Sequence, residues 1–199
     1  MTDDYDRRKE FCKDIESLSR SEIENFLALA KSKLEIHSIP VFIESGTYLA
    51  ETTMNAAALF SECHTIELDP ALHYAAKQKL SGFNNVQSHL GDSVKVLPHL
   101  LSEIWAPIFF WLDGHWSGGN TARGSQDCPL LDEVQIIIDK CRQKMAIVVD
   151  DVRLFGTKIN EDWSEVTQTS ILSKFMTGDR LIDWDICGDR MILYVDSAA

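Results

Sequence analysis

One short stretch constrains the fold of this chain more than any other. The apolar run 41–43 leads into Glu44–Thr47, an acid followed by a glycine turn, and a helix-forming segment begins at Thr52. A strand, a glycine turn and a helix in this order form a nucleotide-binding corner in α/β proteins, because glycine lets the backbone approach a ligand and the helix N-terminus offers unpaired N–H groups. Glu67 ends the next apolar run, about 20 residues later, where a carboxylate can accept both hydroxyls of a ribose.

Length and composition favour a single soluble domain. The chain has 199 residues, of which 45% are hydrophobic and 25% charged, and its formal net charge is −12. This acidity argues against nucleic acid and against anionic membrane surfaces as partners, since both attract clustered Lys and Arg. No apolar run approaches the roughly 20 residues that cross a bilayer, and the charged N-terminus lacks a signal-peptide core, so the predicted location is cytoplasmic. The five scattered cysteines form no Cys-x-x-Cys pair, which argues against zinc or a disulfide framework.

The remaining pattern alternates strands and helices. Residues 1–38 are expected to form an N-terminal helical extension with a capping box at Ser21 and Glu24, packed on the sheet or over the ligand, with a plain structural role favoured. Residues 39–199 carry strands expected at 40–44, 63–67, 85–90, 107–112, 145–149, 181–187 and 190–195, and helices at 52–62, 70–80, 161–176 and after Ser93 and Pro129. This alternation predicts parallel strands, and Gly188-Asp189 predicts a final hairpin with an antiparallel last strand.

Acidic residues follow nearly every predicted strand. They are Glu44, Glu67, Asp92, Asp113, Asp150 and Asp151. The carboxyl ends of parallel strands meet at one edge of the sheet, where ligands bind. Carboxylates gathered there repel each other, so we expect a cationic or donor-rich ligand, or a divalent metal, to bind among them. For Asp92 alone, a helix cap before Ser93 is an equally simple explanation.

In element order and motifs, residues 38–196 resemble the class I S-adenosylmethionine-dependent methyltransferases. The resemblance implies a three-layer, Rossmann-like α/β fold with a doubly wound sheet in the order 3-2-1-4-5-7-6. It also implies that the cofactor is bound by Glu44, Ser45, Gly46, Thr47, Glu67, Asp92, Ser93 and Asp113. Tyr48 and Ala50 depart from the family's usual glycines. A dinucleotide-binding turn, Gly-x-Gly-x-x-Gly, would need glycine at 46, 48 and 51, but Tyr48 and Glu51 occupy two of these positions. Their side chains argue against a dinucleotide, because pyrophosphate needs a close approach of the backbone.

Asp113, Asp150 and Asp151 are similar to the metal ligands of catechol-type O-methyltransferases and of sugar- and antibiotic-tailoring relatives. That resemblance implies Mg²⁺ held by these three carboxylates, a hard cation on oxygen ligands. The metal would lower the pKa of an attacking hydroxyl. Asp113 and His115 are the predicted catalytic residues. His115 is a candidate general base, and the alternative is that His115 only orients Asp113 through a hydrogen bond.

The sequence therefore predicts methyl transfer from S-adenosylmethionine to a hydroxyl of a small molecule, assisted by Mg²⁺. The alternatives are a non-methylating enzyme, a catalytically silent binding protein on the same scaffold, or nucleotide-dependent sugar or antibiotic tailoring. Trp116, Arg123 and Arg153 are candidates for substrate contacts, with salt bridges favoured for the arginines, whereas Trp111 is expected in the core. The substrate and the oligomeric state stay open, a homodimer being one option.

Overall fold

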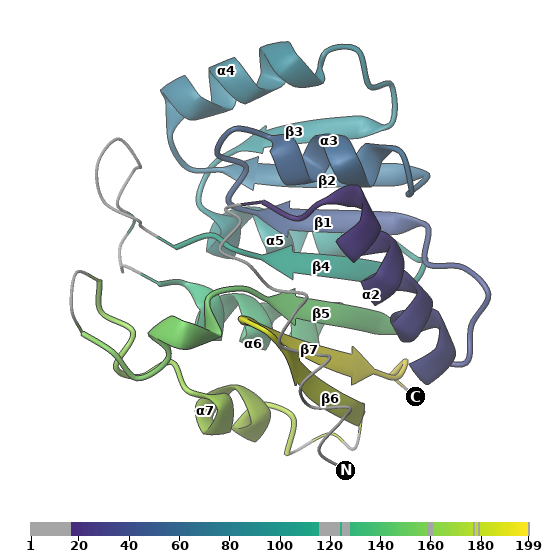
Figure 1. The fold of residues 1–199 in the computed structure, drawn as a ribbon, viewed down its shortest axis with the longest axis vertical. Coiled ribbons are helices and arrows are strands. Elements are labelled where there is room, and N and C mark those ends of the chain that lie inside the picture. The colour runs from purple at the N-terminus through teal and green to yellow at the C-terminus, as the bar shows by residue number, and fades with distance from the viewer. Residues whose placement is uncertain are drawn as a thin grey trace.

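The structure is a computed structural model that describes residues 17–115, 124, 128–158, 161–176, 178 and 180–198. Strands and helices alternate along the described chain (Figure 1). The strands are β1 (Val41–Ser45), β2 (Glu62–Glu67), β3 (Val86–Leu90), β4 (Ile108–Leu112), β5 (Met145–Val149), β6 (Leu181–Cys187) and β7 (Arg190–Val195). The helices are α2 (Arg20–Lys33), α3 (Glu51–Ala57), α4 (Pro70–Leu80), α5 (Ser93–Glu103), α6 (Leu130–Lys140), the 3-10 helix η1 (Val152–Leu154) and α7 (Gln168–Ser173).

The strands form one seven-stranded sheet in the order β3-β2-β1-β4-β5-β7-β6. Strands β1 to β5 pair in parallel, whereas β7 is antiparallel to both β5 and β6. This order confirms the predicted Rossmann-like, doubly wound sheet with a C-terminal hairpin. The carboxyl ends of the parallel strands, and the acids that follow them, therefore lie at one edge.

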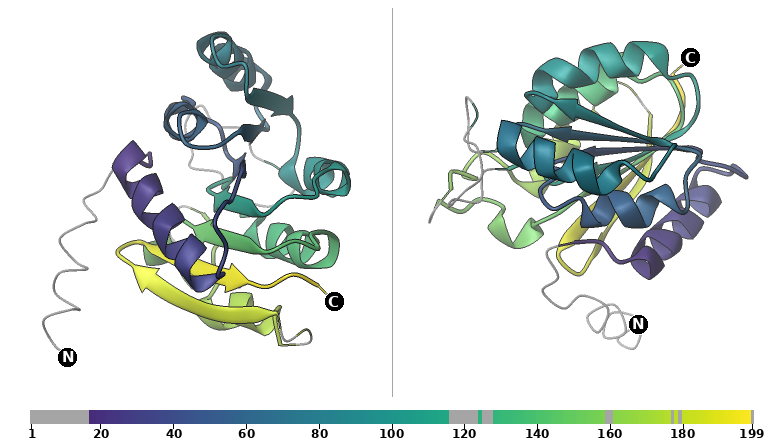
Figure 2. Two further views of the ribbon diagram at one scale, coloured as in Figure 1. Left: turned by 90° about the vertical axis from the view of Figure 1, so that its right-hand side faces the viewer. Right: turned by 90° about the horizontal axis from the view of Figure 1, so that it is seen from above.

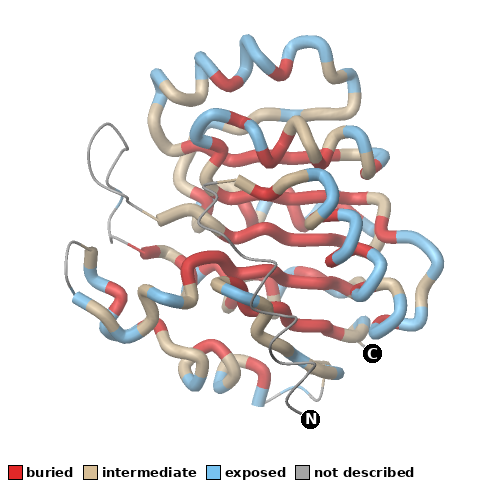
Figure 3. Tube along the Cα trace, viewed as in Figure 1, coloured by how far each residue is buried: buried red, intermediate tan, exposed pale blue. Residues whose placement is uncertain are grey.

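Helices cover both faces of the sheet (Figure 2). Side chains of α5, α6 and α7 share one apolar cluster with one face of the sheet, and those of α2 share another with the opposite face. Because both faces are covered, the central strands are continuous apolar runs; all of β1, β4 and β5 is buried (Figure 3). Trp111 is 1% exposed and lies in the core, as predicted. None of the described helices is long and apolar enough to span a membrane.

The capping box predicted at Ser21 and Glu24 is wrong by two residues. Ser19 caps α2: its hydroxyl accepts a hydrogen bond from Glu22 N at 3.3 Å, and the Glu22 carboxylate accepts one from Ser19 N at 2.9 Å. The buried face of α2 packs into the cluster that contains Trp111. This helix therefore packs on the sheet, one of the two placements expected for the N-terminal segment. Residues 1–16 lie outside the described part of the chain, so the helical extension over 1–38 stays a prediction.

The predicted helix at 161–176 is confined to α7, Gln168–Ser173. The segment before α7 folds back on the loop after η1, because the Gly156 N–H donates to the carbonyl oxygens of Trp163 and Val166 at 3.1 and 2.8 Å. These two carbonyl oxygens accept hydrogen bonds from outside the segment and not from residues of a continuing helix, so the helix does not extend back through Trp163. The helix predicted at 52–62 likewise ends at Ala57, and β2 already begins at Glu62.

Candidate active site

The turn after β1 packs directly against the segment after β4. Gly46 has a left-handed φ of 85°, and a Cβ on it would lie 2.3 Å from the carbonyl oxygen of Asp113. Tyr48 and Ala50 also have positive φ values, 44° and 63°, which residues with a side chain rarely adopt. The two positions at which the resemblance implies glycine thus have a glycine-like backbone although each carries a side chain.

Glu44 and Glu67, at the ends of β1 and β2, bind neighbouring parts of the protein. The buried Glu44 carboxylate accepts a hydrogen bond from Thr65 Oγ1 at 2.6 Å and another from Thr53 Oγ1. Burial raises the pKa of Glu44 to about 7, against the effect of these two hydroxyls. Glu67 accepts hydrogen bonds from Tyr48 N and Asp69 N, both at 2.9 Å, and so joins the turns after β1 and β2.

Asp92, after β3, has the geometry of a helix cap. Its carboxylate accepts a hydrogen bond from Val94 N at 3.1 Å, and Lys95 Nζ lies 3.4 Å from its other oxygen. The alternative role foreseen for this residue, a helix cap, is therefore present, and its contact with the cofactor stays a prediction. Ser93 is the first residue of α5 and is largely buried.

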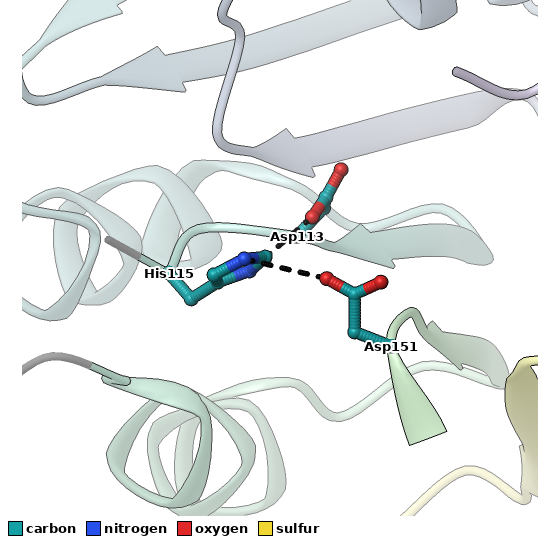
Figure 4. A group of neighbouring side chains, drawn as sticks. All are labelled: Asp113, His115 and Asp151. Atoms are coloured by element: carbon teal, nitrogen blue, oxygen red, sulfur yellow. Dashed lines mark ion pairs between the residues drawn. The ribbon is translucent and has the colours of Figure 1, made fainter. Parts of the chain in front are cut away.

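Asp113, His115 and Asp151 come together at the ends of β4 and β5. His115 lies between the two carboxylates, with Nδ1 3.5 Å from Asp113 Oδ1 and Nε2 3.3 Å from Asp151 Oδ2 (Figure 4). One potential ligand atom from each of the three residues lies within 4.8 Å of the others. Asp113 and Asp151 were predicted as metal ligands, whereas His115 joins them as a third residue of the group.

Burial and neighbouring charges shift the protonation of this group. The pKa of Asp113 is raised well above its usual value, first by burial and then by the carboxylates of Asp150, Asp151 and Glu44. Burial lowers the pKa of His115, although Asp151 and Glu161 favour its protonated form. A neutral imidazole beside two acids can accept a proton or bind a metal.

Asp150 and Asp151, although adjacent, point to different partners. Asp150 Oδ1 lies 3.3 Å from Arg190 Nε, and the guanidinium also donates to Glu22 Oε1 at 2.8 Å. Burial raises the pKa of Asp150 to about 6, opposed by Arg190. Asp151 has a left-handed φ of 63° and pairs with Arg153, which also binds Asp189.

No protein-family model matches the sequence, and no curated protein matches it. Among solved structures, the O-methyltransferase TomG from Streptomyces achromogenes, involved in tomaymycin synthesis and in complex with SAM, aligns over 92% of this chain and 82% of its own at TM-score 0.62 and 15% identity. An O-methyltransferase from Bacillus cereus in complex with SAH aligns over 91% and 83% at TM-score 0.62 and 15% identity. An rRNA methylase from Streptococcus thermophilus aligns over 86% and 95% at TM-score 0.52 and 14% identity. This chain has the class I methyltransferase fold.

Within this methyltransferase fold, the residues at the ends of β4 and β5 fit a divalent metal. Their donor set is two carboxylates and one imidazole, which suits Mg²⁺ through its oxygens and transition metals through its nitrogen. A second group, Asp150, Asp151 and Asp189, also lies within 4.8 Å. The predicted trio Asp113, Asp150 and Asp151 is thus divided between two groups that share Asp151.

Four residues beside the group of Asp113, His115 and Asp151 were not foreseen: Glu133, Glu161, Trp163 and Arg190. Glu161 Oε2 lies 3.6 Å from His115 Nε2 and accepts a hydrogen bond from Trp163 Nε1 at 2.8 Å, while the Trp163 ring meets the His115 ring edge-on at 5.0 Å. Only Glu133 left a sequence signal, because it interrupts the apolar face of α6 between Leu130 and Val134.

Other predicted contacts have mixed outcomes. Arg153 forms salt bridges with acids, the explanation that the sequence favoured. Trp116 and Arg123 lie outside the described residues, and their substrate contacts stay predictions. Ser45 ends β1, and Gly46 and Thr47 form the turn after it; the contacts of these three residues with a cofactor likewise stay predictions.

Proposed function

We propose that this protein transfers the methyl group of S-adenosylmethionine to a hydroxyl of a small molecule, with Mg²⁺ assisting. The observation that carries the proposal is the grouping of Asp113, His115 and Asp151 at the carboxyl edge of a methyltransferase-type sheet. The neighbours solved with SAM or SAH support the choice of cofactor.

His115 is the proposed general base. A substrate proton accepted at Nε2 would be stabilised because the carboxylates of Asp151 and Glu161 lie 3.3 and 3.6 Å away. Trp163 donates a hydrogen bond to the Glu161 carboxylate and packs edge-on against the imidazole of His115. These contacts restrict the orientation of the imidazole ring before substrate binds. When bound by Asp113 and Asp151, Mg²⁺ supplies Lewis acidity that lowers the pKa of a substrate hydroxyl.

Calorimetric titration with S-adenosylhomocysteine tests the cofactor. Micromolar binding is expected, and no heat at millimolar ligand would remove the proposal. Methyl transfer from S-adenosylmethionine to panels of phenols, sugars and carboxylic acids tests the reaction. Cofactor binding without transfer to any of them would favour a binding protein on the same scaffold.

Metal dependence is tested separately with Asp151→Asn and a matched control, Asp139→Asn, on the exposed end of α6. Titration with Mg²⁺ or Mn²⁺ should show binding to the wild type and to the control, and at least about tenfold weaker binding to Asp151→Asn, since a metal ligand is lost. Full activity after EDTA treatment would contradict the metal's role and leave the cofactor proposal intact.

A further inference from the structure

Two imidazole rings meet on β2 and the edge strand β3, whereas the group of Asp113, His115 and Asp151 follows β4 and β5. His64, on β2, is 2% exposed, and His89, on β3, is half-buried. His64 Nδ1 and His89 Nε2 lie 3.1 Å apart, and the rings stack with their centres 5.3 Å apart. Histidine is the commonest metal ligand in proteins, and this pair has no part in the proposed methyl transfer.

Glu62 sets the direction in which the first imidazole presents its lone pair. The Glu62 carboxylate accepts a hydrogen bond from His64 Nε2 at 2.9 Å, so the proton of the neutral ring is on Nε2 and the lone pair on Nδ1 faces His89. Histidines that bind a metal through one nitrogen usually donate the other N–H to a carboxylate or carbonyl in this way. His64 is therefore oriented as a metal ligand is.

Both rings are neutral at pH 7, which is the form that binds metals. Burial lowers the pKa of His64, although Glu62 and Glu103 favour its protonated form. Burial also lowers the pKa of His89, and the neighbouring His64 and His73 add to this shift. The two acids that favour positive charge at His64 would equally favour a bound cation.

The distance between the two nitrogens suits a shared metal ion. With metal–nitrogen bonds of about 2 Å, nitrogens 3.1 Å apart subtend an angle of about 100° at the metal, between the octahedral and tetrahedral values. No third His, Cys, Asp or Glu of the described chain joins the pair within 4.8 Å, so water must complete the coordination. Water can reach the site because His89 is half-buried on an edge strand.

We infer that His64 Nδ1 and His89 Nε2 together bind a late transition-metal ion such as Zn²⁺ or Ni²⁺, with Glu62 orienting His64. Two imidazoles and no carboxylate select these ions over Mg²⁺. In the metal-free pair one N–H lies between the two nitrogens; when the metal binds, His89 carries its proton on Nδ1 instead, and no proton is lost. The ion links the edge strand β3 to β2. The competing explanation is a hydrogen bond between two neutral rings, without a metal.

Calorimetric titration with Ni²⁺ and with Zn²⁺, after EDTA treatment and dialysis, tests the site. Asp151→Asn is the background, because it weakens the separate group that contains His115. This protein should bind one metal ion, and adding His89→Gln should weaken binding at least about tenfold, since one of two protein ligands is lost. Adding Glu62→Ala should weaken it about tenfold through the orientation of His64.

His99→Gln in the same background is the matched control, because His99 is exposed on α5, and it should leave metal binding unchanged. No binding to Asp151→Asn at submillimolar Ni²⁺ or Zn²⁺ overturns the inference, even if His89→Gln fails to fold, and leaves the hydrogen bond as the explanation. Undiminished binding by a folded protein with His89→Gln overturns it as well. Neither histidine belongs to the proposed methyl-transfer site, so these results leave the proposed function untouched.

Discussion

Replacement of Glu44 by glutamine should stabilise the protein at alkaline pH and change its pH dependence. Glu44 is 1% exposed, and burial raises its pKa from 4.5 to about 7. A carboxyl whose pKa is raised on folding binds its proton more tightly in the folded state. Its contribution to stability is therefore complete below about pH 4.5 and is lost as the pH rises towards 7.

The size of the effect follows from the two pKa values. Each pKa unit corresponds to about 1.4 kcal/mol, so ionising Glu44 in place costs about 3 kcal/mol of unfolding free energy once both states are charged. At pH 5 less than about 1 kcal/mol of this cost is expressed, and at pH 8 nearly all of it. Glu44→Gln stays neutral and can still accept from Thr53 and Thr65. The unfolding free energy of Glu44→Gln, relative to that of the wild type, should therefore be about 2 to 3 kcal/mol higher at pH 8 than at pH 5.

Urea denaturation of both proteins at pH 5 and pH 8 measures this gain directly. Other titrating groups are common to both proteins, and their contributions cancel in the difference except where Glu44 itself shifts them, as it raises the pKa of Asp113. Glu24→Gln, at an exposed position on α2, is the control and should show little change in the same difference. If the difference between wild type and Glu44→Gln is the same at both pH values, the assigned pKa of Glu44 is wrong.

Two further predictions concern the fold. Ser19→Ala should lower the unfolding free energy by about 1 kcal/mol because it removes the cap of α2, whereas Ser21→Ala should leave it nearly unchanged; equal losses in thermal unfolding would contradict the observed cap. Gly46→Ala should destabilise the protein by several kcal/mol and weaken S-adenosylhomocysteine binding, because its Cβ would collide with the Asp113 carbonyl at a φ of 85°. Gly82→Ala, with open space around the added methyl, is the matched control, and comparable losses in the two alanine variants would refute the steric argument.

The strand pattern was predictable because burial on both faces leaves an unambiguous record in the sequence. β4 and β5 are uninterrupted apolar runs, and the acid after each run marks where the strand ends. The limits of helices were less predictable, since several residues can serve as caps and tertiary contacts choose among them. Ser19 prevails over Ser21 because Glu22, its capping partner, is also held by Arg190 from β7.

The site was predictable only where its residues follow strands. Asp113 and Asp151 could be placed at the edge of the sheet because topology brings strand ends together. Glu161 and Trp163 reach His115 from an irregular segment, and no periodicity in the sequence reports its path. Glu133 was visible as a charged residue on an apolar helix face, a pattern break that indicates either a buried partner or a ligand.

The separation of Asp150 from Asp151 changes how the acidic edge is understood. Neighbouring residues of a strand point to opposite faces of the sheet. Directly after β5, the left-handed backbone of Asp151 also turns the chain into η1. Asp150 then meets Arg190, which Glu22 also binds, whereas Asp151 pairs with Arg153. Asp151 remains in both acidic groups and contacts His115 as well. Either arrangement of a metal at this edge therefore depends on Asp151, whereas only the group with Asp189 includes Asp150.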